Sequence, residues 1–180
     1  MPVLNPNKVT FSAGAKVKVA RYGSQNFTEL GLLGEDANLV FDRQVRQKND
    51  YYPEVPVAVA VRSESASLEF TVREWTPENV ALAFGLTSDD VVTTTNPQQT
   101  THTMKVGGRG TVNYYTLKIE EDLTNGERRV FTLHKAILGI RGGLPILTAE
   151  TAADLPMVAN AVYDPTANAV LTIELIEPVS

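Results

Sequence analysis

The sequence predicts a mainly β (α+β) fold, a two-sheet β-sandwich with one flanking helix at about residues 77–84 and a long projecting loop. Three observations support this class. Apolar and polar residues alternate in several segments, an Asn-Gly pair separates two of these segments, and one segment alone carries helix start and stop signals. We expect a single domain over residues 1–180, because a chain of this length fits one core.

The first part of the chain predicts two strands and a projecting loop. Residues 16–20 and 38–46 have extended character, and the Gly-rich residues 23–34 form a loop between them. A polar and aromatic stretch bounded by prolines follows this second strand. It predicts a loop that projects from the domain at about residues 46–56.

The next predicted strand is long, from about residue 57 to residue 73, and the phase of its apolar positions changes. These positions are odd-numbered in the first half and even-numbered in the second, namely Val57, Val59 and Val61, then Leu68, Phe70 and Val72. A bulge near residues 63–66, or passage of the strand from one sheet environment to another, would produce this change.

A short helix is predicted directly after this strand. Thr76 is a suitable N-cap, Pro77 suits the first helical position, and Gly85 suits a left-handed C-terminal cap. The apolar side chains of this segment are expected to pack on the core, and these are Trp75, Val80, Ala81 and Phe84.

The second half of the chain predicts two hairpins. Residues 111–122 and 127–138 flank Asn125-Gly126, a strong hairpin signal, and their core-facing residues should be Tyr115, Leu117, Ile119, Phe131 and Leu133. Residues 155–163 and 169–177 are expected to form a last hairpin around the turn at 164–168. The Thr-rich residues 87–99 suit a surface loop or an edge strand.

Composition argues against several classes of function. The sequence has no cysteine, so it offers no disulfide, thiolate nucleophile or sulfur-ligated metal site. Its net charge of −5 argues against a general nucleic-acid-binding surface. We also expect no membrane span and no secretory signal, since the apolar stretches are short and the N-terminus lacks a basic region before an apolar run.

Candidate catalytic patterns are weak, and we predict a protein that is not an enzyme and has no cofactor. His102 and His134 lack a carboxylate or a second histidine at ligand spacing. The glycine-rich residues 107–110 lack the Lys-Ser/Thr of a phosphate-binding loop. Long strands with exposed edges remain, and such edges favour ordered self-association.

Residues 61–86 carry the most specific pattern. The Leu-x-Phe-x-Val strand before Glu74, the Thr-x-Glu-Asn helix start at Thr76 and the closing Gly85 resemble the strand-helix core of phage major tail tube proteins. The order around this core is similar too, with a turn at 32–34, a loop up to Glu54, and closing strands at 155–156 and 171–173. Residues 87–115 match no part of that pattern.

The resemblance implies a virion protein with no enzymatic activity. Six copies would close into a ring whose inner strands form one continuous β-barrel, and stacked rings would form the hollow tube through which DNA is ejected. The implied partners are other copies of the chain and the tape measure, tail terminator and baseplate proteins. DNA would pass the lumen without specific binding, no membrane would be involved, and the protein would reach the virion tail after synthesis in the host bacterial cytoplasm.

The resemblance also implies two sets of site residues. N- and C-terminal arms and the projecting loop would contact a neighbouring subunit or ring, and the loop comprises Arg46, Gln47, Lys48, Asn49, Asp50, Tyr51, Tyr52, Pro53 and Glu54. The candidate lumen-facing residues are Ser67, Glu69, Thr71, Glu120 and Asp122, for which the tube exterior is the alternative.

Two other functions fit the sequence. A tail terminator or baseplate ring protein of the same fold would cap a tube rather than polymerise. A carbohydrate- or cell-surface-binding β-sandwich would use Tyr51, Tyr52 and Trp75 as a stacking platform. The position of Trp75 at the helix entry favours a packing role instead.

Overall fold

The computed structural model describes residues 8–11, 14–31, 33, 37–49, 56–108, 110–123, 126–143 and 154–178. The described chain is mainly β, with two sheets and one short α-helix, which confirms the predicted fold class. One sheet has nine strands and the other is a two-stranded hairpin.

The large sheet is antiparallel throughout, in the order β1-β4-β5-β10-β9-β8-β2-β3, and β11 also pairs with β9. Its strands are β1 (Lys8–Phe11), β2 (Lys16–Arg21), β3 (Thr28–Glu29), β4 (Ala37–Asn49), β5 (Pro56–Val72), β8 (Tyr115–Asp122), β9 (Arg128–Ile140), β10 (Leu155–Ala161) and β11 (Leu171–Ile176).

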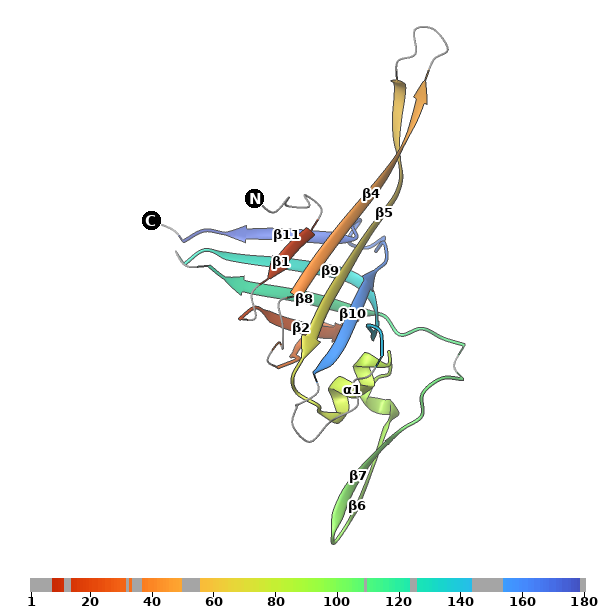
Figure 1. Cartoon of the computed structure of the whole chain (residues 1–180), viewed down its shortest axis with the longest axis vertical. Coiled ribbons are helices and arrows are strands. Elements are labelled where there is room, and N and C mark those ends of the chain that lie inside the picture. Colours follow the sequence, from red (N-terminus) through yellow and green to blue (C-terminus); the bar gives the residue numbers. More distant parts are fainter. Residues whose placement is uncertain are drawn as a thin grey trace.

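The sheet has two wings, and β10 joins them. We call β1, β4 and β5 the first wing, and β2, β3, β8, β9 and β11 the second wing. Figure 1 shows that the two wings cross at a steep angle. Their inner faces pack together, as the edge-to-face contact of Phe11 in β1 with Phe131 in β9 shows, with ring centroids 4.9 Å apart. The layers of this sandwich are therefore two parts of one continuous sheet.

The core lies between the wings and consists of the side chains on the apolar side of each strand. Leu68, Phe70 and Val72 are buried on β5, as the alternating pattern predicts. The predicted core-facing residues of β8 and β9 are all buried as well, namely Tyr115, Leu117, Ile119, Phe131 and Leu133. The β8–β9 pairing is confirmed, while the turn residues 124 and 125 lie outside the described residues.

The predicted last hairpin is wrong. β10 and β11 do not pair with each other, and the turn between them contains one isolated bridge, between Asp164 and Ala169. Instead they lie one after the other along the same edge of β9, with β10 opposite residues 136–140 and β11 opposite residues 128–133. The free side of β10 is taken by β5. The sequence shows two strands and a turn, but the choice of partner depends on strands distant in the sequence.

The predicted helix is confirmed as α1 (Pro77–Ala83). The Thr76 side chain accepts a hydrogen bond from the Asn79 backbone N–H at 3.1 Å, and Pro77 starts the helix. Gly85 has φ +68°, and the N–H groups of Gly85 and Leu86 bond to the carbonyls of Leu82 and Ala81, as in a Schellman motif.

The packing of α1 differs in part from the prediction. Ala81 is fully buried, and Val80 packs against the core while Phe84 is half-buried beside Leu138. The prediction is wrong for Trp75, which is 39% exposed because the chain is still outside the core before the helix begins. Ala83 and Asn79 are the other buried helical residues.

Asn79 is a polar residue that the sequence did not single out. Its side-chain amide donates to the Leu30 carbonyl at 3.2 Å and to the Glu74 carbonyl at 2.9 Å. These bonds tie the helix to the loop before it and to the loop after β3. A buried amide is stable here because both of its donors are satisfied.

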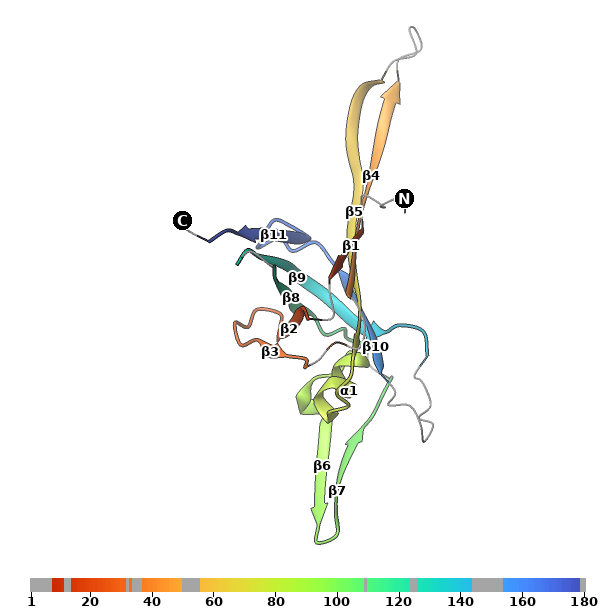
Figure 2. The same ribbon diagram turned by 60° about the vertical axis from the view of Figure 1, so that its left-hand side comes forward.

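Residues 87–99 were expected to be a surface loop or an edge strand. Residues 88–104 form a 3₁₀ turn, η1 (Ser88–Asp90), and a hairpin of β6 (Val91–Asn96) and β7 (Gln99–Met104). The hairpin projects at the end of the molecule opposite to the β4–β5 tip (Figures 1 and 2). Every side chain from Val92 to Thr103 is exposed. This hairpin therefore has no share in the core.

Candidate assembly surfaces

The outer parts of β4 and β5 form a two-stranded ribbon that extends beyond the core (Figure 1). We define the ribbon as residues 42–46 and 60–65, whose side chains are all exposed. A two-stranded ribbon without a packed face is marginally stable in water. Within one copy of the chain, the ribbon therefore lacks the packed face that would stabilise it.

The predicted loop begins later than expected. Arg46 lies in the ribbon and is exposed, and Gln47, Lys48 and Asn49 are paired residues of β4 rather than loop residues. The strand continues because its partner β5 begins at Pro56 and extends the ladder. Asp50, Tyr51, Tyr52, Pro53 and Glu54 lie outside the described residues.

A bulge sets which side chains share the core-facing side of the ribbon. Gln44 is opposite Ser63 and Val45 is opposite Val61, so Arg62 is the extra residue of β5. The phase change is thus explained by a bulge directly before the predicted interval of 63–66, together with the departure of the strand from the core there. The bulge places Val61, and not Arg62, across from Val45.

The core-facing side of the ribbon continues the buried side of β4 and β5. Leu39 and Leu68 form a buried pair, followed by the Arg43–Glu64 ion pair at 2.6 Å. Val45 and Val61 come next, and they are 50% and 54% exposed. An apolar pair therefore lies outside the core, on the side of the ribbon that continues the buried side of the two strands.

A second unpartnered apolar surface lies on β11. Ile173 is opposite Phe131 and Leu175 is opposite Arg129, so both share the core-facing side of β9. They are nevertheless 55% and 74% exposed, because the first wing does not extend over this end of the second wing. Among the described strands, β11 pairs only with β9, which leaves its other edge open.

The predicted lumen residues lie on the outer face of the sheet, on two different wings. Ser67 and Glu69 are half-buried on β5, and Glu69 accepts a hydrogen bond from Arg141 at 3.0 Å. Thr71 lies opposite Pro156 of β10 and is only 5% exposed, so its assignment to a lumen surface is wrong. Asp122 is exposed at the end of β8.

Glu120 is the centre of a charge cluster on the outer face of the second wing. Its carboxylate accepts from Lys18 at 2.7 Å and is also paired with Arg128. Burial alone would raise the pKa of Glu120, but the hydrogen bond and charge of Lys18, together with Arg128, outweigh burial and lower it. This carboxylate is ionised and engaged at neutral pH.

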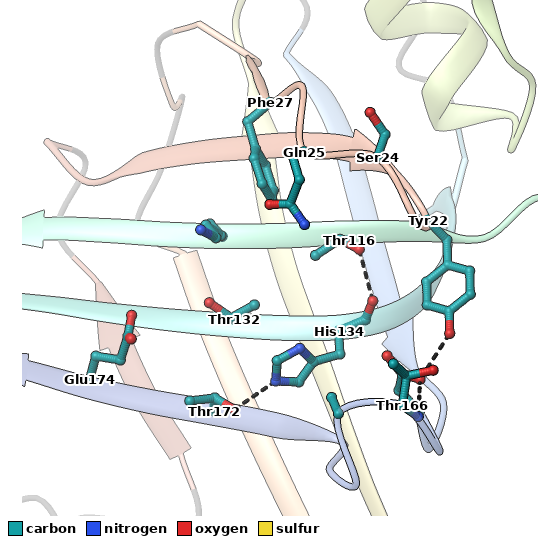
Figure 3. Close-up of a pocket in the computed structure, with 14 residues that line it drawn as sticks. Tyr22, Ser24, Gln25, Phe27, Thr116, Thr132, His134, Thr166, Thr172 and Glu174 are labelled. Atoms are coloured by element: carbon teal, nitrogen blue, oxygen red, sulfur yellow. Dashed lines mark hydrogen bonds between the residues drawn. The ribbon is translucent and has the colours of Figure 1, made fainter.

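An open groove of about 620 Å³ lies on the same outer face, and Figure 3 shows its lining. The Tyr22 hydroxyl donates to Asp164 at 2.8 Å, and His134 Nε2 lies 2.6 Å from the Thr172 hydroxyl. The hydrogen bond to Asp164 raises the pKa of Tyr22, which keeps the phenol protonated. These groups are hydrogen-bonded in pairs, and they form a polar surface without an activated nucleophile.

No protein-family model matches the sequence, and a search of curated proteins finds no match. Within the described ranges there is no helix long and apolar enough to cross a membrane. In the same ranges, no three His, Cys, Asp or Glu side chains cluster in a way suited to a metal ion. The described residues form a mainly β domain with the projecting β4–β5 ribbon, the projecting β6–β7 hairpin, and the apolar strand β11, which has one open edge.

Proposed function

We propose that this chain is a structural virion protein that assembles into hexameric rings, which stack as the hollow tail tube of a long-tailed phage. The observation that carries the proposal is the ribbon of β4 and β5, which extends beyond the core with an exposed apolar pair. The resemblance of residues 61–86 to tail tube proteins coincides with this strand and with α1.

The open edge of β11 supports the same function. An unpaired strand edge is a template for pairing with another chain, and ring closure removes such edges. The short β3 pairs with β2 only at Lys18 and Val19, so the opposite end of the second wing also offers backbone groups for pairing. Strands of adjacent copies would then join into one wall around the ring.

The charge balance supports a conduit for DNA. A net charge of −5 disfavours tight phosphate binding. The lysine and arginine side chains around Glu120 are engaged by that carboxylate, and so they do not form a basic surface of their own. A wall with this balance lets DNA slide rather than bind.

Electron microscopy of the purified chain tests the proposal. We expect hollow tubes or six-fold rings to form as protein concentration rises. A variant without residues 47–54 should remain folded by circular dichroism and fail to form tubes. The proposed function would be contradicted if this variant formed tubes as well as the wild type does. It would also be contradicted if the wild-type chain stayed monomeric at every concentration, even with a nucleating tail complex present. Rings that never stack would indicate a capping protein instead.

A further inference from the structure

The groove on the outer face of the second wing has a floor, a wall and a closed end. Side chains of β8, β9 and β11 form the floor, and the loop at residues 22–27 forms one wall (Figure 3). The hydrogen bond from Tyr22 to Asp164 joins this loop to the turn at 164–168 and closes one end. The volume of about 620 Å³ lies within the range of about 300–1,000 Å³ that small-molecule sites occupy.

Three side chains of the floor form a row across the strands. Lys118 of β8 is opposite Thr132 of β9, and Thr132 is opposite Thr172 of β11. His134 and Glu174 each lie two positions along their strands from this row, and both line the groove on the same face. The floor therefore offers hydroxyl, ammonium, imidazole and carboxylate groups together.

Thr132 is the floor residue that points most directly to a ligand. It is 7% exposed and lines the groove, yet its hydroxyl makes no hydrogen bond to any residue that the structure describes. By contrast, the Thr116 hydroxyl donates to the His134 carbonyl at 2.8 Å, and the Thr172 hydroxyl lies 2.6 Å from His134 Nε2. Buried hydroxyls are almost always paired, so the partner of Thr132 comes from a molecule in the groove.

The charged groups of the groove limit which ligand fits. Lys118 and Glu174 form no ion pair within the described part of the chain. The Lys118 ammonium lies 4.6 Å from the centre of the Phe27 ring, and this cation–π contact holds it beside the floor. One lysine and two carboxylates, Glu174 and Asp164, line the groove, so it does not attract a phosphate group or a nucleic acid.

We propose that this groove binds a neutral oligosaccharide. Sugar hydroxyls both donate and accept hydrogen bonds, which suits a floor where threonine hydroxyls, an ammonium group and a carboxylate share one face. Phe27 and Tyr22 add ring surface for the apolar faces of the sugar. A peptide fits less well, because peptides add to sheets at strand edges and the groove lies on a sheet face. This binding goes beyond the proposed assembly and does not depend on it.

A glycan array of neutral and acidic oligosaccharides, probed with the unassembled full chain, tests the proposal. Neutral oligosaccharides should bind and acidic ones should not, because Glu174 and Asp164 repel negative charge. Titration calorimetry with the best neutral oligosaccharide then compares variants. Thr132→Val removes the hydroxyl and nearly keeps the shape, and it should weaken the affinity by about three- to tenfold. As a matched control, Thr94→Val on the exposed β6–β7 hairpin should bind as the wild type does.

Two further variants keep the test sharp if Thr132→Val does not fold. Lys118→Met removes the ammonium and keeps an unbranched side chain, and Gln25→Ala changes an exposed loop position that lines the groove. Each should weaken the affinity by about two- to tenfold. The proposal is overturned if no neutral oligosaccharide binds, if acidic ones bind better, or if all the folded groove variants bind with wild-type affinity. None of these results bears on the tail tube function, which electron microscopy tests separately.

Discussion

The β4–β5 ribbon and the β6–β7 hairpin are both two-stranded, and they project from opposite ends of the molecule, yet they are held in different ways. The ribbon continues strands whose inner parts are buried at Leu39 and Leu68. The hairpin is held by local cross-strand contacts, such as Thr93 with His102 at 2.9 Å and Thr95 with Thr100 at 3.3 Å. Its turn adds hydrogen bonds from the Gln98 and Gln99 backbone N–H groups to Asn96.

The difference shows that projection alone does not define a contact surface. The ribbon carries arginines, an ion pair and a bulge that selects its apolar residues. The hairpin, residues 91–104, contains no Lys, Arg, Asp or Glu. Charged residues protect a strand edge from unintended pairing, and this protection is present on the ribbon and absent from the hairpin.

The largest expected effect concerns the root of the ribbon. Leu68→Ala should cost about 2–5 kcal/mol of the free energy of unfolding, because it opens a cavity in the fully buried core. Thr94→Ala, on the exposed hairpin, should change it by less than about 0.5 kcal/mol. Urea unfolding of the unassembled protein measures both. Equal costs at the two sites would remove the distinction between an anchored and a locally held ribbon.

Amide hydrogen exchange should show the same contrast without mutation. Residues 68–72 lie in the buried part of β5 and pair with β10, and they should exchange only through global unfolding. Residues 92–103 should exchange through local opening, faster by about a factor of one hundred or more. Mass spectrometry of the unassembled chain checks this. Similar protection in both segments would mean that the hairpin has a partner even before assembly.

Acid should act on the sheet and spare the hairpin, which has no carboxylate. The folded-state pKa of Glu120 is lowered, so its ion pairs stabilise the fold above its usual pKa of 4.5, and this contribution is lost as pH falls from 4.5 through the lowered value. Glu120→Gln should cost about 1–3 kcal/mol at pH 7 and flatten the loss of stability below pH 4.5. Asp89→Asn, at a position whose side chain is 82% exposed, is a matched control and should cost less than about 0.5 kcal/mol at pH 7.

The smallest effect is expected where the hairpin joins the domain. The Asp90 carboxylate accepts from the Thr87 backbone N–H at 2.8 Å and from its hydroxyl at 3.0 Å, which fixes the turn before β6. Asp90→Ala should cost about 0.5–1 kcal/mol and speed exchange in β6 and β7 while the root of the ribbon is unaffected. If exchange at 68–72 rose in parallel, the two regions would be coupled and the comparison would need revision.

The sequence predicted the parts of the fold that local signals determine. The helix ends follow from Thr76, Pro77 and Gly85, whose side chains or backbone freedom act within one turn. The pairing of β8 with β9 follows from alternation and a short connection. These signals act over a few residues and are visible without the rest of the molecule.

The remaining features depend on contacts between distant segments. Nothing near residues 155–176 shows that β10 and β11 share one edge of β9, because β5 competes for the other side of β10. The role of Asn79 requires the Leu30 carbonyl, 49 positions away. Among the candidate assembly surfaces, the ribbon left a sign in the sequence, which is the phase change of β5. The exposure of Ile173 and Leu175 left none, because it depends on where the other wing ends.

The position of β10 has a consequence for when the protein folds during synthesis. β10 is hydrogen-bonded to β5 on one side and to β9 on the other, so among the described strands it is the one that connects the two wings into a single sheet. The ribosome releases β5, β8 and β9 before β10, which begins some eighty residues after the end of β5. A nascent chain therefore lacks the strand that connects the two wings until residues 155–161 have been synthesised. Formation of the continuous sheet thus requires that β10 has already been synthesised.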